Sequence, residues 1–228
     1  MALTTIHLGY APDPVEYSSA LDTQHRLHAD VVADPTQAYL LLLEHPAVYT
    51  AGRRTGDAER PKDGTPVLDV DRGGLITWHG PGQLVAYPIL PLADVTAIKD
   101  YVTRLEQAVI DTVGAYGVEG VRVPGRAGVW VLEPGRPDRK IAAIGIHVDH
   151  GVTYHGVALN IDNDLAPYKN IIPCGIADAD VTTLANETGK SITVTDVAPV
   201  FEAALRETLA AAIKPEALLA RPREEVSA

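Results

Sequence analysis

The chain has a single cysteine, Cys174, in the run Ile172-Pro173-Cys174-Gly175. Pro173 cannot donate a hydrogen bond to a central strand and Gly175 favours a turn, so we expect the thiol on a bend that faces a pocket. The alternative is an inert thiol buried in the core. At its ordinary pKa of about 8.5, a thiol is only a few per cent thiolate at neutral pH. A cation about 4 Å away, at an effective dielectric constant of about 20, would bring that pKa close to neutrality.

Lys140 is the candidate cation, because it opens an apolar segment that we predict to be a strand. Strand alternation would place Lys140, Ala142 and Ile144 on one face. Gly145 on the same strand would allow a ligand to approach the backbone closely. The alternative is a solvated charge at the edge of a strand. We predict that Cys174 is a nucleophile and that Lys140 activates it.

A glycine-rich segment, residues 71–83, carries four glycines, a proline, an arginine and a histidine just before an apolar strand. Glycines let the backbone approach a substrate and leave N–H groups free to bind it. The segment has neither the Gly-Lys-Ser/Thr of a phosphate-binding loop nor the dinucleotide-binding spacing. We therefore predict a substrate-binding segment rather than an ordinary turn. Within it, His79 is suited to orienting the substrate or transferring a proton.

Three further histidines, His147, His150 and His155, raise the alternative of a metal site. Strand alternation would turn His150 away from His147, and no pair of ligands has helical spacing. We expect no bound metal.

Hydrophobic periodicity predicts helices towards both ends of the chain and short strands between them, which is typical of an α+β fold. The clearest helix spans residues 97–116 and stops at Gly117. We expect one domain over residues 1–228, with its core at about 10–215 and a frayed tail at 221–228. The other predicted elements are a helix over 14–29, strands over 38–43 and 84–87 (the latter ended by Pro88), a surface loop over 59–65, strands over 128–132, 140–147 and 156–161, and a final helix capped by Thr195 or Asp196.

The composition excludes several classes of protein. Hydrophobic residues make up 46% and charged residues 21% of the 228 residues, as in ordinary globular domains. The formal net charge of −11 argues against a nucleic-acid partner. No stretch approaches the roughly 20 apolar residues of a membrane span, the first residues lack a secretory pattern, and one cysteine cannot form an internal disulfide. We expect no membrane partner and a cytoplasmic location.

Five segments together resemble the lipoyl(octanoyl) transferase family, which shares a fold superfamily with lipoate and biotin protein ligases. They occur in the family's order, and the resemblance spans about residues 40–187. The resemblance implies the biotin/lipoate protein ligase catalytic-domain fold, with mixed, mainly antiparallel sheets flanked by helices. The five segments are residues 72–84, 125–131, 140–145, 155–160 and 172–175.

The family's activity is the transfer of an octanoyl group from acyl carrier protein to a lysine of a lipoyl domain. The acceptors are the lipoyl domains of 2-oxoacid dehydrogenase complexes and the H protein of glycine cleavage. By this resemblance Cys174 forms the acyl thioester and Lys140 lowers the pKa of its thiol. No cofactor is implied, and nothing in the sequence demands more than a monomer.

The resemblance also implies which residues line the acyl-binding channel. Ala143 departs from the pattern, because some relatives carry serine there. The partner proteins are acidic, so two arginine groups, Arg53 with Arg54 and Arg126 with Arg136 and Arg139, become the expected docking surface. The implied substrate-binding residues are Arg72, Gly73, Gly74, Leu75, Ile76, Thr77, Trp78, His79, Ala143, Ile144, Gly145, Gly156, Val157 and Ala158.

Two other functions remain open. An ATP-dependent lipoate or biotin protein ligase would carry similar segments but would use its lysine on an adenylate and would need no cysteine. A non-catalytic module that binds acyl carrier protein or lipoyl domains would keep the docking surface and form no acyl-enzyme. A cysteine hydrolase is a weaker third alternative, because it requires a histidine partner and a route for water.

Overall fold

The computed structural model describes residues 3–61, 64–92, 97–171, 179–210 and 212. Cys174 lies outside the described residues, as do residues 62–63 of the expected surface loop and the expected tail at 221–228. In the described part of the chain, no helix combines the length and the apolar character needed to cross a membrane.

The described strands form two sheets, and the larger one has eight strands. Its order is β1-β2-β6-β10-β9-β8-β7, with β11 added beside β9. β1 pairs parallel with β2 and β11 parallel with β9, whereas the other neighbours are antiparallel. A three-stranded sheet, β4-β3-β5, completes the fold. The strands are β1 (Thr4–Gly9), β2 (Tyr39–Leu43), β3 (Val48–Ala51), β4 (Val67–Asp69), β5 (Thr77–His79), β6 (Gln83–Ile89), β7 (Val121–Val123), β8 (Arg126–Val131), β9 (Arg139–Asp149), β10 (Val152–Asn160) and β11 (Asp180–Val181).

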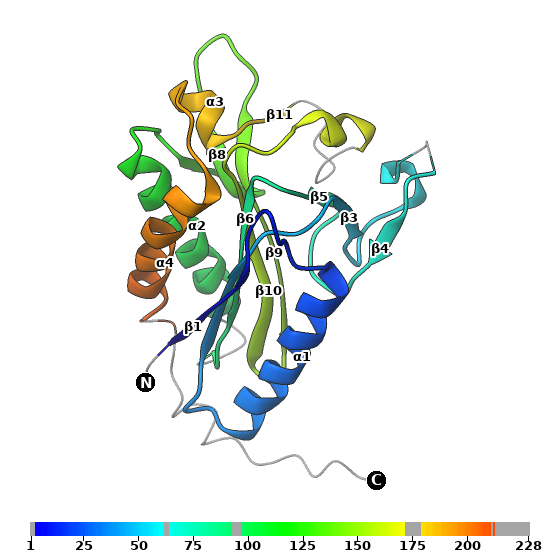
Figure 1. Cartoon of the computed structure of the whole chain (residues 1–228), viewed down its shortest axis with the longest axis vertical. Coiled ribbons are helices and arrows are strands. Elements are labelled where there is room, and N and C mark those ends of the chain that lie inside the picture. The colour runs from blue at the N-terminus through cyan, green and yellow to red at the C-terminus, as the bar shows by residue number, and fades with distance from the viewer. Residues whose placement is uncertain (1–2, 62–63, 93–96, 172–178, 211, 213–228) are drawn as a thin grey trace.

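Helices cover both faces of the larger sheet (Figure 1). The helix α1 lies on one face against β10 and β6, while α2 and α4 pack together on the other face. The α+β prediction is confirmed, because the chain builds a mixed, mainly antiparallel sheet between helical layers. The helical elements are α1 (Tyr17–Ala33), α2 (Ile98–Ala115), α3 (Leu184–Thr188), α4 (Val194–Leu209) and the short 3₁₀ turns η1 (Asp57–Glu59) and η3 (Ala166–Asn170).

The apolar run of β2 shows why the sheet is covered on both sides. Leu40 and Leu42 belong to the core beneath α2 and α4, whereas Leu41 and Leu43 belong to the core beneath α1. Successive side chains of a strand point to opposite faces, so a continuous apolar run indicates a strand buried on both.

Two predicted element ends are wrong. The predicted strand end at Pro88 is wrong because β6 continues to Ile89, with Pro88 opposite Leu40 of β2. The pairing of β6 with β10 ends at Ala86, before Pro88 is reached. The missing N–H of Pro88 therefore costs no hydrogen bond between β6 and β10. The last helix is capped by Thr193 rather than by Thr195 or Asp196, because the Thr193 side chain accepts from the Asp196 N–H and the Asp196 carboxylate accepts from the Thr193 N–H.

A β-bulge at the start of β9 decides which face of the sheet carries Lys140. Val129 and Trp130 are consecutive in β8, but they pair with Ala142 and Lys140, so Ile141 is an extra residue in β9. The predicted shared face is therefore wrong for Lys140, whereas Ala142 and Ile144 do lie on one face. Ala142 packs in the core beneath α2 and α4.

Strand alternation in β8 shows where Lys140 points instead. Val129 and Val131 face the core beneath α2 and α4, so Trp130 between them faces the α1 side, and its partner Lys140 does the same. Ala143 lies on this side as well, opposite Ala158, which belongs to the core beneath α1.

Candidate functional site

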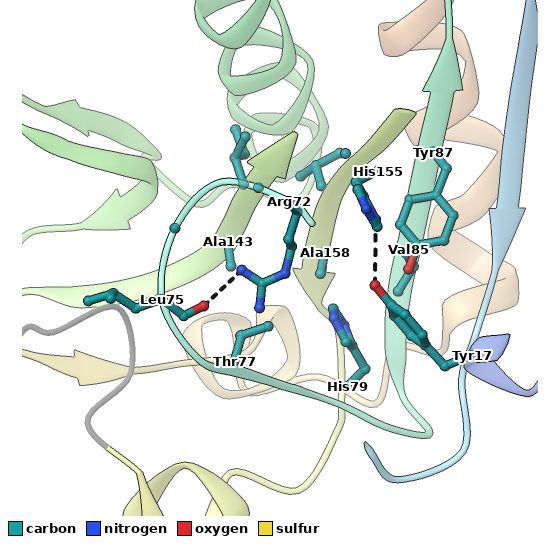
Figure 2. Close-up of a pocket in the computed structure, with 15 residues that line it drawn as sticks. Tyr17, Arg72, Leu75, Thr77, His79, Val85, Tyr87, Ala143, His155 and Ala158 are labelled. Carbon is teal, nitrogen blue, oxygen red and sulfur yellow. Dashed lines mark hydrogen bonds between the residues drawn. The ribbon is translucent and has the colours of Figure 1, made fainter. Parts of the chain in front are cut away.

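A pocket of about 450 Å³, including space open to solvent, lies on the α1 side of the larger sheet. This volume is within the usual range for small-molecule sites. Its floor comes from β6, β9 and β10, and its walls come from α1 and from the glycine-rich loop before β5 (Figure 2). The lining residues are Tyr17, Arg72, Gly74, Leu75, Thr77, His79, Val85, Tyr87, Ala143, Ile144, Gly145, His155, Gly156, Val157 and Ala158.

The pocket brings together most of the substrate-binding residues expected from the sequence, from three separate segments. Gly73, Ile76 and Trp78 do not line it. Ile76 and Trp78 pack instead with the Tyr168 ring, and the Gly73 N–H donates to the Ile146 carbonyl (2.9 Å). The expected residues in the lining are Arg72, Gly74, Leu75, Thr77, His79, Ala143, Ile144, Gly145, Gly156, Val157 and Ala158.

Four lining residues were not among the substrate-binding residues expected from the sequence: Tyr17, Val85, Tyr87 and His155, although His155 was considered as a metal ligand. They come from α1, β6 and β10, which are far apart in the sequence. One sequence signal was present, because Tyr87 is a polar group inside an otherwise apolar strand.

Two glycines on adjacent strands allow close packing at the pocket floor. Gly145 and Gly156 face each other across β9 and β10. A Cβ atom on Gly145 would lie 2.9 Å from Arg72 Cδ, and one on Gly156 would lie 2.2 Å from the Ala86 carbonyl oxygen. The absent side chains therefore let the Arg72 side chain lie on the sheet and let the strands approach closely.

The Arg72 guanidinium organises the glycine-rich loop that surrounds it (Figure 2). It is buried and donates to the carbonyls of Gly73 (3.0 Å) and Leu75 (2.8 Å) in that loop. It also donates to the carbonyl (2.7 Å) and hydroxyl (2.9 Å) of Thr50 in β3. Arg72 thus ties the loop to the smaller sheet and leaves a positive charge in the pocket wall.

Asp71 connects the pocket wall to the protein surface. Its carboxylate accepts from His155 Nε2 (2.8 Å), from His147 Nδ1 (2.9 Å) and from the Tyr154 hydroxyl. These hydrogen bonds hold the pKa of Asp71 well below its usual range, and the bond from His155 has the largest effect. Because Nε2 of His155 donates, its Nδ1 accepts from the Tyr17 hydroxyl at 3.5 Å.

His155 carries a second sign of tertiary constraint. Its φ of 56° lies in the left-handed region, which residues other than glycine adopt infrequently. Its N–H donates to the Gln24 side chain of α1 (2.8 Å), which holds the turned backbone in place.

Buried histidines around the pocket are held neutral. Burial lowers the pKa of His79 well below 6.5, and it lowers that of His45 to about 4. His79 Nδ1 donates to Gln83 Oε1 (2.7 Å), so its Nε2 is an acceptor. His45 Nδ1 donates to the Val15 carbonyl (2.7 Å), and its Nε2 accepts from the Tyr87 hydroxyl (2.8 Å). The imidazoles in and beside the pocket wall therefore carry no charge at neutral pH.

Acid is expected to destabilise the protein through His45. Its folded pKa of about 4 lies below the ordinary 6.5, so the unfolded chain binds the extra proton between these pH values. The contribution of His45 to the free energy of unfolding is fully present at pH values above 6.5. It falls by about 3 kcal/mol as the pH drops to 4. Urea unfolding at pH 7.5, 6 and 5 measures this loss. His45→Gln, which keeps a donor and an acceptor, should have a shallower pH dependence, and an unchanged dependence would contradict the assignment.

Lys140 lies outside the pocket lining but on the same side of the sheet. Its side chain is 7% exposed, and its Nζ lies 4.7 Å from the centre of the Trp130 ring. β11 runs beside it, with Val181 opposite Lys140 and the Thr182 N–H donating to the Lys140 carbonyl (2.9 Å). Cys174, its expected partner, is outside the described residues.

The described residues contain no group of three or more His, Cys, Asp or Glu side chains arranged to hold a metal ion. His147 and His155 both contact the Asp71 carboxylate, so they take part in a hydrogen-bonded cluster.

The architecture and the matched family model define the class of protein. The model of the lipoyl protein ligase A/B catalytic domain matches residues 16–206. A bi-partite lipoate protein ligase from Thermoplasma acidophilum, described with its E2 lipoyl domain, superimposes with a TM-score of 0.67 at 16% identity, covering 96% of this chain and 90% of that one. Lipoate-protein ligase A bound with ATP gives a TM-score of 0.62 at 13% identity, covering 92% of this chain and 86% of that one. The chain therefore has the fold of this class of catalytic domain.

Sequence relatives define the family within that class. An octanoyltransferase of Pseudarthrobacter chlorophenolicus is 58% identical over 202 residues, which cover 88% of this chain and 91% of the relative. An octanoyltransferase of Acidothermus cellulolyticus is 52% identical over 212 residues, which cover 93% and 92%. The chain belongs to the octanoyltransferase family, and the resemblance noted in its sequence is confirmed.

Proposed function

We propose that this octanoyltransferase takes its acyl group from octanoyl acyl carrier protein and passes it to a lysine of a lipoyl domain through a thioester on Cys174. The acceptors are the lipoyl domains of 2-oxoacid dehydrogenase complexes and the H protein of glycine cleavage. The chain acts in the cytoplasm as one catalytic domain, residues 1–228, and as a monomer.

The observation that carries this proposal is the position of Lys140 beside described residues that flank Cys174 in the sequence. Lys140 is a buried cation on the pocket side of the sheet. The described chain ends at Ile171 and resumes at residue 179, immediately before β11, whose Val181 is paired with Lys140. Ile171 belongs to the hydrophobic cluster against which Val181 packs. The described residues on either side of Cys174 in the sequence thus include Val181, which is paired with Lys140, and Ile171, whose cluster Val181 contacts. A cation near the thiol is what a reactive thiolate requires.

The proposed chemistry consists of two acyl-transfer steps, a thioester exchange followed by the formation of an amide. The Cys174 thiolate attacks the octanoyl carbonyl, the bond to the carrier sulfur breaks, and that sulfur leaves as a thiol with a proton. The lysine amine of the acceptor then attacks the new thioester, forms an amide, loses a proton and releases the Cys174 sulfur. Lys140 stabilises the thiolate and carries the proton between the groups. Since a thioester is already activated, no ATP is consumed.

The pocket suits an unbranched acyl chain. Its floor includes the small side chains of Ala143 and Ala158, which leave space for methylene groups. Arg72, Gly74, Leu75, Thr77 and the remaining expected lining residues complete the proposed acyl-binding site.

The proposed docking surface is narrower than the sequence suggested. Arg126 pairs with Asp138 (3.3 Å), Arg136 with Glu133 (3.0 Å), and Arg139 with Glu187 (2.8 Å). A carrier protein would have to compete with these carboxylates. Arg53 and Arg54 are exposed, and their backbone N–H groups donate to Arg72 and Gly74 of the pocket loop. We therefore propose Arg53 and Arg54 as the basic contact for an acidic partner.

Intact-mass measurement tests the proposal directly. The protein is incubated with octanoyl acyl carrier protein without ATP, in parallel with Cys174→Ala. We expect an added octanoyl mass that is absent in the variant and is discharged when a lipoyl domain is supplied. Transfer that appears only with ATP and free acid would show a ligase. No reaction under either condition would favour a binding module, and release of free octanoate would indicate a hydrolase.

A further inference from the structure

We propose that Trp130 is a positioning residue for Lys140, because its indole face holds the ammonium group in place without neutralising it. This inference rests on the proposed function, in which Lys140 stabilises the Cys174 thiolate.

The pairing of β8 with β9 brings the two side chains together. Trp130 lies directly opposite Lys140, and the bulge at Ile141 turns Lys140 to the face that Trp130 occupies. The Lys140 Nζ lies 4.7 Å from the ring centre, within the range of a cation–π contact. Both side chains are buried, so water competes little for the ammonium group.

Gly128 lets β8 lie close to β9 next to Lys140. Its φ is 110°, and a Cβ atom there would lie 2.3 Å from the Ala142 carbonyl oxygen and 3.4 Å from Lys140 Cε. Any side chain at this position would push β8 away from β9. The backbone therefore adopts a conformation that favours glycine and keeps β8 close to β9, where Trp130 lies opposite Lys140.

The indole is held rigidly, as a positioning group must be. Its Nε1 donates to the Arg126 carbonyl (3.0 Å), and the side chain is 1% exposed. The Arg126 guanidinium lies 5.6 Å from the centre of the same ring and pairs with Asp138 (3.3 Å).

The charges around Lys140 explain why an aromatic ring suits this position. No described carboxylate forms an ion pair with Lys140. Glu106 of α2 contacts the neighbouring strand β8, where its carboxylate accepts a hydrogen bond from the Gly128 N–H (3.1 Å) and pairs with Arg122 (3.2 Å). A carboxylate would offset the positive potential that a thiolate needs. A ring attracts the ammonium through its quadrupole, has no net charge, and leaves N–H donors for the sulfur.

The test measures alkylation of the thiol by iodoacetamide between pH 5 and 10. The chain has one cysteine, so the reaction reports Cys174 alone. The proteins compared are the wild type, Trp130→Phe, Trp130→Leu, Lys140→Met and the double variant Trp130→Leu/Lys140→Met. We expect Trp130→Leu to move the profile to higher pH and to slow alkylation at pH 7 about tenfold, with Trp130→Phe intermediate. In the Lys140→Met background, Trp130→Leu should add little.

A purely structural role for Trp130 would give a different pattern. If Trp130→Leu slows alkylation equally with and without Lys140, or leaves the profile unchanged while Lys140→Met shifts it, the inference is overturned and the proposed function stands. If Lys140→Met also leaves the profile unchanged, the proposed role of Lys140 fails and the inference fails with it.

Discussion

Replacing Lys140 by methionine is expected to slow octanoyl transfer by about 10²- to 10⁴-fold at pH 7, the range over which positioned proton-transfer groups act. Methionine fills nearly the same volume, so the buried site beside Trp130 stays packed. Under the proposed mechanism, the variant loses the cation that stabilises the thiolate and the group that carries the proton. The measurement is the single-turnover rate of acyl-enzyme formation from octanoyl acyl carrier protein.

The pH dependence of this variant separates the two roles of Lys140. If the lysine acts mainly through the thiol pKa, the rate should recover towards that of the wild type as the pH rises above about 8.5. If proton transfer dominates, the loss persists at high pH. Lys190→Met is the matched control, because Lys190 is exposed and lies just after α3. A Lys140→Met rate within threefold of the wild type at pH 7 would remove Lys140 from the mechanism.

Gly156→Ala is expected to lower the free energy of unfolding by about 3 kcal/mol. The added Cβ would lie 2.2 Å from the Ala86 carbonyl oxygen and 2.9 Å from Pro88 Cδ. The first of these is backbone of the neighbouring strand, where Val157 pairs with Ala86, so relief requires β6 and β10 to separate. This junction lies in the centre of the sheet beneath the pocket. Urea unfolding at pH 7.5, where the buried histidines are neutral, measures the loss.

Gly114→Ala is the control for Gly156→Ala. A Cβ atom at Gly114 in α2 meets nothing within 4 Å, so this variant should gain about 0.5–1 kcal/mol from the higher helix propensity of alanine. An unfolding midpoint of Gly156→Ala equal to that of the wild type would contradict the close packing of β6 on β10. If instead the free energy of unfolding is unchanged but acylation slows, the substitution has distorted the pocket floor.

Sequence patterns predicted well the elements whose structure is determined by residues within the same segment. The helix expected over residues 97–116 is observed over Ile98–Ala115, because its buried stripe repeats at three- and four-residue steps. The buried strand expected over residues 38–43 is β2. Short strands such as β3, β4 and β5 escaped prediction, since each has only three or four residues and gains its stability from pairing with distant segments.

The pocket residues also fall into two groups, those that local motifs indicated and those that only packing brought together. Motifs indicated that the glycine-rich loop and the strands with Gly145 and Gly156 bind substrate, and most of those residues line one pocket. Tyr17 and Tyr87 carry no motif. They join the pocket because α1 packs across β6 and β10.

The sequence by itself determined the family and the α+β class, and it supplied the proposal that Cys174 and Lys140 are the reactive groups, because these inferences depend on residue types and their order. Only the tertiary structure decided which face of the sheet carries Lys140. One extra residue in β9 reverses the face that simple alternation predicts, and the register of that bulge is set by the pairing with β8. The neutral state of the histidines was likewise decided by burial, which arises only when distant elements pack together.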